Sequence, residues 1–117
     1  MDEPAPIPTP TYLTIDDFKK VEIKIGEILS VEQIEGSDKL LKLKVNFGDH
    51  ERQVLSGIKA YFPEVQVLVG KKCPFVTNLA PRMMMGLESQ AMILAAGGGE
   101  TPFALFETAG APGDRIK

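Results

Sequence analysis

The chain has 117 residues, of which 44% are hydrophobic and 25% charged, and its formal net charge is −3. These values predict one globular domain with a single core, and the longest apolar run, residues 91–96, is far too short to cross a bilayer. One cysteine and one histidine provide neither a disulfide framework nor a zinc site. We therefore expect a cytoplasmic protein without a membrane segment, metal or cofactor.

The charges are unevenly distributed along the chain. Residues 1–18 carry four acidic side chains and no basic one, whereas residues 19–82 carry eleven Lys/Arg against eight Asp/Glu. A mildly basic centre thus lies between acidic ends. Because local patches rather than net charge decide polyanion binding, a nucleic-acid partner remains open. An ordinary solvated surface would carry the same charges.

Four prolines occupy positions 4, 6, 8 and 10. This spacing is incompatible with a helix or a central strand and predicts an extended arm or linker over residues 1–13. A frayed terminus without a role is the alternative. The folded domain is then expected over residues 14–117.

A short helix is predicted directly after the arm. Thr14 can cap the free amides, and Asp16 and Asp17 suit the positive end of the helix dipole. Ile15 and Phe18 lie one turn apart, so we expect them to dock the helix on the body of the domain.

The apolar period changes to two from Val21 and continues to Val31, which predicts a strand. Gly26 inside this strand indicates a bulge or a sharp bend. Further strands are predicted over residues 41–47, 52–56, 73–77, 89–95 and 103–106, with turns at 35–38, 48–50 and 97–99. About five strands and one short helix predict an all-β, five-stranded OB-fold barrel.

No set of residues in the sequence has the composition of a catalytic site. His50 lies in a predicted hairpin and is expected to be solvated, while Cys73 heads an apolar strand and is expected to pack. The glycines at 97–99 precede no helix, so they lack the context of a phosphate-binding loop. The run Met83–Met85 is expected to be loop and core filler. We therefore expect no catalytic residues.

One basic patch is predicted on the barrel wall. Lys42 and Lys44 share one face of a strand, Lys39 precedes them, and Arg52 lies on the predicted hairpin partner. Such a patch can position phosphates without distinguishing sequences, although a solvated strand face is the alternative. No interleaved series of aromatic residues indicates a single-strand binder.

Five sequence blocks follow one another in a recognisable order. They are Phe18 to Ile25, Glu35-Gly36-Ser37-Asp38-Lys39-Leu40, Ser56-Gly57-Ile58, Asn78-Leu79-Ala80-Pro81-Arg82 and Glu88-Ser89-Gln90-Ala91-Met92. In this order they resemble the tRNA-binding domain found at the C-terminus of many bacterial methionyl-tRNA synthetases, in the synthetase beta subunit and in free-standing tRNA-binding proteins. The resemblance covers about residues 14–117.

The resemblance implies an OB-fold barrel with a C-terminal extension, homodimerisation and binding to the L-shaped body of tRNA. It also implies a non-catalytic accessory role beside the catalytic body of methionyl-tRNA synthetase. The phosphate contacts that it implies are Lys24, Lys39, Lys42, Lys44 and Arg52. The polar groups that it places on the nucleic-acid face or in its loops are Ser56, Asn78, Ser89 and Gln90, with Arg82 at a basic loop position.

The sequence departs from the family pattern at one place. After Arg82 the family usually continues basic–Met–basic, whereas this chain has Met83-Met84-Met85. This loop and the acidic balance favour an alternative function, a CsaA-type chaperone-like dimer that binds peptides or proteins. A scaffold that only dimerises synthetase subunits is a third possibility.

Overall fold

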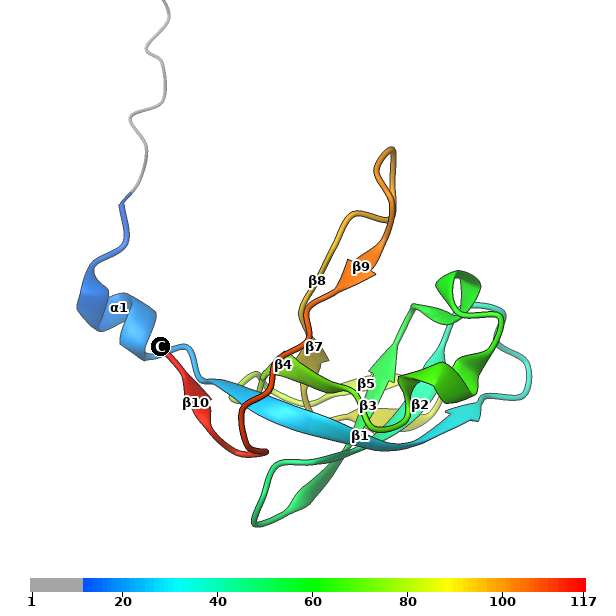
Figure 1. The fold of residues 1–117 in the computed structure, drawn as a ribbon, viewed down its shortest axis with the longest axis horizontal. Helices are drawn as coiled ribbons and strands as arrows, with labels where there is room; N and C mark the ends of the chain where they lie inside the picture. The colour runs from blue at the N-terminus through cyan, green and yellow to red at the C-terminus, as the bar shows by residue number, and fades with distance from the viewer. Residues whose placement is uncertain (1–11) are drawn as a thin grey trace, which may run out of the picture.

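The computed structural model describes residues 12–117, so the predicted proline arm lies almost entirely outside the described residues. One antiparallel sheet has the strand order β3–β2–β1–β4–β7, and β10 pairs with the start of β1 (Figure 1). The strands of this sheet are β1 (Ile23–Gln33), β2 (Leu41–Asn46), β3 (Glu51–Ser56), β4 (Lys72–Val76), β7 (Met92–Ile93) and β10 (Arg115–Ile116). The predicted all-β class is confirmed.

The length of β1 curls the sheet into a barrel. Its first half pairs with β4 and its second half with β2, so one strand belongs to both halves of the barrel. At the outer edge of β3, the backbone oxygen of Gln53 accepts from the backbone N–H of Gln90 at 2.9 Å, and the Leu55 N–H donates to the Ser89 hydroxyl at 3.0 Å. These bonds join β3 to the chain before β7, and the result is the predicted OB-type barrel.

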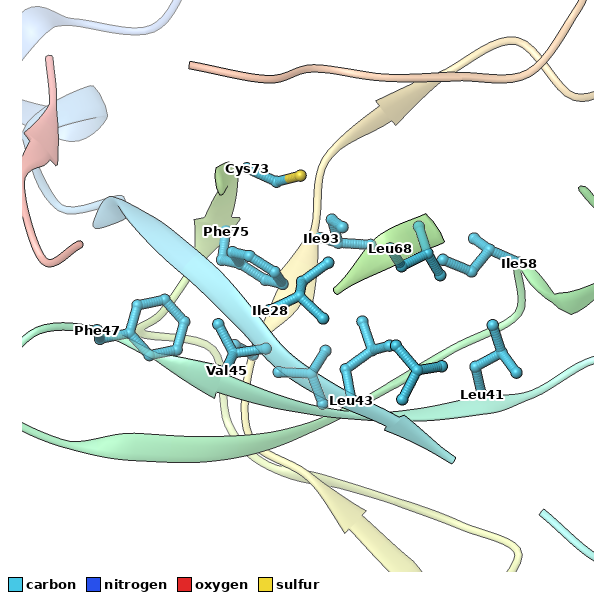
Figure 2. Packing of buried hydrophobic residues seen from close by; sticks show 13 residues of the cluster. Ile28, Leu41, Leu43, Val45, Phe47, Ile58, Leu68, Cys73, Phe75 and Ile93 are labelled. Atoms are coloured by element: carbon cyan, nitrogen blue, oxygen red, sulfur yellow. The ribbon is translucent and has the colours of Figure 1, made fainter. Parts of the chain in front are cut away.

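The barrel interior is built from alternate residues of the strands. Leu41, Leu43 and Val45 point inward from β2 and are fully buried, because successive side chains of a strand face opposite sides. They pack with Phe75 of β4 (Figure 2). Full burial of each aliphatic side chain stabilises the fold by about 1.5–3 kcal/mol. Cys73 is also fully buried in this core, so its predicted packing role is confirmed.

Gly26 is not the bulge that was one of its two predicted roles. The shift of register in β1 lies between Ile28 and Ser30, not at the glycine. A Cβ atom at Gly26 would lie 2.5 Å from Val45 Cγ1 and 2.8 Å from the ring of Phe75. Because Gly26 has no side chain, Val45 of β2 and Phe75 of β4 can pack directly against the backbone of β1.

The prediction of one strand over residues 89–95 is wrong. The chain there forms the end of β6 (Leu87–Ser89), then β7, then β8 (Ala95–Ala96). It is interrupted because Ser89 and Gln90 bond to β3, whereas the residues from Met92 to Leu94 pair with β4. The predicted short strand before the C-terminus is confirmed as β9 (Ala104–Leu105), which pairs with β8 in a hairpin that projects from the barrel (Figure 1).

The predicted N-terminal helix is confirmed as α1 (Ile15–Lys19), whose first turn is capped by the Thr14 hydroxyl at 3.0 Å from the Asp17 N–H. Its predicted docking is wrong, since Ile15 remains 66% and Phe18 43% exposed. The helix buries no residue. It instead leaves apolar side chains facing outward beside β10.

Two short 3-10 helices that the periodicity did not predict connect β3 to β4. They are η1 (Lys59–Tyr61) and η2 (Val65–Leu68), and Leu68 is fully buried in the core. Within residues 12–117, no helix has the length and apolar character needed to cross a membrane.

The methionine run forms part of a second hairpin, made of β5 (Arg82–Met84) and β6. Its two-residue turn places Met85 at φ +52° and Gly86 at φ +77°, the left-handed conformation that a type I′ turn requires. Met83 and Met85 are 67% and 56% exposed, so the expectation that the run fills the core is wrong.

Candidate nucleic-acid interface

A shallow hollow of about 390 Å³ lies on the outer face of β2 and β3. Lys42 and Lys44 reach it because they alternate with the buried residues of β2 and so face outward. The lining side chains include two carboxylates that the sequence did not single out, Glu32 of β1 and Glu51 of β3. The remaining residues of the lining are Ser30, Leu43, Arg52 and Gln53.

Each lysine of this hollow is paired with one carboxylate. Lys42 Nζ lies 2.8 Å from Glu32 Oε2, and Lys44 Nζ lies 3.2 Å from Glu51 Oε1. The hydrogen bond and the charge of Lys42 lower the pKa of Glu32. Arg52 also lines the hollow, but it lies opposite the buried Val45 in the register of β2 and β3, so its side chain leaves β3 on the other face from the lysines.

Arg52 points away from solvent and binds backbone. Its Nη1 donates to the oxygens of Thr77 at 2.5 Å and Gln90 at 3.2 Å, and its Nε donates to His50 Nε2 at 3.0 Å. The guanidinium also lies 5.6 Å from the centre of the Phe47 ring. His50 stacks on the same ring, and its side chain remains 38% exposed, so it is a partly solvated residue at the turn between β2 and β3.

Three of the predicted polar residues hold loops in place. The Ser89 hydroxyl accepts from Leu55 and donates to the oxygen of Ala91 at 3.1 Å. Gln90 Oε1 accepts from the Gln53 N–H at 2.9 Å. Asn78 Oδ1 accepts from the Glu22 N–H at 2.8 Å, and its amide donates to the oxygen of Lys20. Except for the bond to Ala91, each of these bonds spans more than 30 residues of sequence.

A second hollow of about 100 Å³ lies on the other side of β3, between the two ends of the methionine hairpin and β7. Ser56 and Arg82 line it, and Arg82 is exposed and takes part in no ion pair among residues 12–117. Its walls are mainly apolar and are formed by Leu55, Leu79, Ala80, Met84, Ser89, Ala91, Met92 and Ile93.

The structure groups some of the predicted site residues and separates others. The first hollow is lined by Lys42, Lys44 and Arg52, the second by Ser56, Arg82 and Ser89. Lys24, Lys39, Asn78 and Gln90 line neither hollow: Lys24 lies 3.7 Å from Glu22, and Lys39 is exposed in the turn before β2. Glu32 and Glu51 were missed because their places beside the lysines depend on strand pairing, although a period-two pattern puts all four charges on outward faces.

Residues 12–117 contain no group of three or more His, Cys, Asp or Glu side chains arranged to hold a metal ion. Burial raises the pKa of the Cys73 thiol to about 11. A thiol that is protonated and buried is a poor nucleophile.

Comparison with known proteins identifies the family. The family described as "Putative tRNA binding domain" matches residues 23–115. The chain is 51% identical over 85 residues to the methionine–tRNA ligase of Caldanaerobacter subterraneus subsp. tengcongensis, and 55% identical over 86 residues to that of Lactococcus lactis. These alignments cover 73% and 72% of this chain but only 13% of each ligase.

Solved structures of similar length share the fold. A MetRS-related protein from Pyrococcus horikoshii is 34% identical with a TM-score of 0.85, over 92% of this chain and 99% of that one. The CsaA chaperone protein from Picrophilus torridus is 30% identical with a TM-score of 0.80, over 91% and 100% of the two chains. The match to the domain family covers both hollows, and the chain belongs to the tRNA-binding domain family.

Proposed function

We propose that this chain binds the folded body of tRNA through phosphate contacts, as a non-catalytic, dimeric accessory domain of a cytoplasmic methionine–tRNA ligase. The observation that carries the proposal is the pair of outward-facing lysines on β2 in a chain of this family. Lys42 and Lys44 would contact phosphates in the first hollow, and the exposed Arg82 would contact them beyond β3. We propose residues 14–117 as the folded domain and residues 1–13 as the linker to the ligase body.

The arrangement of aromatic rings supports recognition of shape rather than of exposed bases. Tyr61 stacks on Phe103 with ring centres 4.2 Å apart, and Phe62 packs edge-on against the same ring. These three rings pack on one another and line neither hollow. Phosphate contacts position a nucleic acid without distinguishing its sequence, and a folded RNA is recognised by the spacing of its backbone.

The other predicted contacts have a supporting place in this proposal. Lys24 and Lys39 would add long-range attraction from the margins of the barrel. Arg52 would hold the strands in register beneath the phosphates. Ser56 would donate to the RNA from the second hollow, while Asn78, Ser89 and Gln90 would position its loops.

A titration of fluorescent tRNA, followed by anisotropy between about 50 and 200 mM salt, tests the proposal. The wild-type protein should bind tRNA more tightly than an unstructured RNA of equal length. The double variant Lys42→Gln/Lys44→Gln should bind every tRNA more weakly and reduce the magnitude of the salt slope by about 1.5. Equal affinity of wild type and double variant would contradict the assignment of the lysines.

A control variant tests whether the loss of two positive charges anywhere on the chain weakens binding. Lys20 and Lys71 are also ion-paired, at 3.5 Å to Asp17 and 3.0 Å to Glu107, and they lie outside both hollows. Lys20→Gln/Lys71→Gln loses the same two charges and should keep most of the affinity. If both double variants weaken binding equally, the attraction is diffuse rather than local.

The dimer would form at the apolar groove of about 400 Å³ beside α1. Ile15, Phe18, Val21 and Ile116 line this groove, and all four are more than a third exposed. A second copy would cover them. Light scattering should give twice the 12.7 kDa mass of the chain, and Phe18→Asp should give the monomer. A monomeric wild type would refute the dimer.

Exposed methionines favour one alternative function, the binding of unfolded polypeptide. Met83 and Met85 present flexible apolar surface at the tip of their hairpin, and methionine adapts to varied partners. Binding of an unfolded protein together with no tRNA binding at 50 mM salt would select this alternative. Met83→Lys/Met85→Lys separates the two functions, because it should strengthen tRNA binding on the first proposal and weaken polypeptide binding on the second.

A further inference from the structure

The two lysines of the first hollow are not free cations. Glu32 lies directly opposite Lys42 in the register of β1 and β2, and its carboxylate is 2.8 Å from the ammonium group. Glu51 pairs with Asn46, two residues beyond Lys44, and reaches back to within 3.2 Å of it. Both carboxylates line the same hollow as the lysines.

These pairs are exposed enough to be exchanged. The side chains of Lys42 and Glu32 are 33% and 61% exposed, and those of Lys44 and Glu51 are 60% and 49% exposed. Ion pairs at such a surface contribute little stability and are screened by salt. A phosphate can therefore take the place of a carboxylate beside each ammonium group. The displaced carboxylate stays on a neighbouring strand, close to the incoming negative charge.

We infer that Glu32 and Glu51 compete with RNA phosphates for Lys42 and Lys44, and that this competition keeps the affinity of the barrel wall low. The inference rests on the proposed tRNA binding and concerns the regulation of its strength. A ligand that offers one or two phosphates gains little from displacing a carboxylate. A folded RNA that contacts both hollows, or both copies of a dimer, gains enough in total to do so. The carboxylates thus weaken the binding of short or unstructured polyanions more than the binding of a folded RNA.

Replacing both carboxylates by their amide equivalents tests the inference. Glu32→Gln/Glu51→Gln should bind tRNA about 5- to 10-fold more tightly at 100 mM salt, because two repulsions at a few ångströms are removed. The salt slope should become steeper by only a few tenths, because two lysines can contribute about 1.8 at most and the paired lysines of the wild type already contribute about 1.5. The gain for an unstructured RNA should equal or exceed that for tRNA, so discrimination between the two should fall.

The control variant Glu35→Gln/Glu100→Gln changes the net charge by the same amount. Both residues are exposed, line no hollow and take part in no ion pair among residues 12–117. It should tighten binding less than about 2-fold, because neither carboxylate contacts Lys42 or Lys44. Circular dichroism of all variants checks that each is folded.

The outcomes separate the inference from the function on which it rests. If wild type binds tRNA and the two double variants gain equally, the effect is one of net charge and the competition is refuted. If wild type binds and Glu32→Gln/Glu51→Gln gains nothing, the carboxylates do not compete. If neither wild type nor Glu32→Gln/Glu51→Gln binds tRNA at 50 mM salt, the proposed function fails and the inference fails with it.

Discussion

Arg52 allows a sharp test of whether a basic residue in the first hollow contacts ligand or holds the barrel together. Its guanidinium donates to two backbone oxygens, those of Thr77 and Gln90, and so ties β3 to the end of β4 and to the chain before β7. Hydrogen bonds from a charged group contribute about 1.5–3 kcal/mol each when sheltered. Because this side chain is half-buried, we expect Arg52→Met to lower the free energy of unfolding by about 2–4 kcal/mol.

Lys44→Met is the matched control, since it removes one positive charge from the same hollow and replaces it with the same side chain. Its exposed ion pair with Glu51 contributes less than about 1 kcal/mol. Urea unfolding followed by far-ultraviolet circular dichroism measures both free energies. Arg52→Lys adds a second comparison, because it keeps the charge but loses the planar fork that reaches both oxygens. If Arg52→Met were no more destabilising than Lys44→Met, the structural role argued for Arg52 would be refuted.

Three further outcomes are expected. Gly26→Ala should cost about 3 kcal/mol of unfolding free energy because its Cβ would overlap core side chains, whereas Gly57→Ala, which meets nothing within 4 Å, should cost less than about 1 kcal/mol in the same urea titration. The Thr77 hydroxyl, 2.5 Å from the Glu22 carboxylate, lowers the pKa of Glu22 from its ordinary value. The stability that this bond contributes is present above the ordinary pKa of a glutamate and is lost as pH falls through the lowered pKa of Glu22. Thr77→Val should therefore lower the free energy of unfolding by about 1 kcal/mol at pH 7 and by less at pH 3. A difference that does not change with pH would contradict this reasoning. Cys73, with its pKa raised to about 11, should react with iodoacetamide at pH 8 only as urea unfolds the protein; fast labelling of the native state would show that the core opens locally.

The core of the barrel could be predicted from the sequence because its signal is local. The alternation of Leu41, Leu43 and Val45 with lysines defines both faces of β2 without knowledge of any partner strand. The cap at Thr14 is likewise a matter of four consecutive residues. Both predictions are confirmed, because each depends only on the spacing of residues that are close together in the sequence.

The interrupted segment after β6 could not be predicted, because its signals come from residues distant in sequence. The run Ala91–Ala96 is as apolar as any strand, yet its path is set by Leu55 and Gln53, whose bonds to Ser89 and Gln90 cross about 35 residues. Side-chain hydroxyl and amide groups there replace a regular ladder.

The first hollow could likewise be predicted only in part, because its ion pairs depend on residues distant in sequence. The positive charge of its lysines and their alternation along β2 could be read from the sequence. Their carboxylate partners can be identified only when the register of β1, β2 and β3 is known. A sequence pattern reports which side of a strand a charge occupies. It does not report which charge lies opposite, and for an ion pair that neighbour determines how much of the charge a ligand meets.

This pairing also reconciles an acidic chain with a polyanionic ligand. The net charge of −3 opposes RNA at long range, where salt screens it, whereas the two lysines of the first hollow can attract phosphates at short range. With Arg52 engaged by backbone and each lysine held by a carboxylate, one copy offers few free charges. Useful affinity on the proposed function must then come from several weak contacts made together. Two copies joined at the α1 groove would supply these contacts. Once one copy has bound the RNA, the hollows of the other copy meet the same RNA at a high effective concentration. Weak individual contacts and dimerisation are therefore linked requirements, and loss of the dimer should cost more affinity than loss of any one lysine.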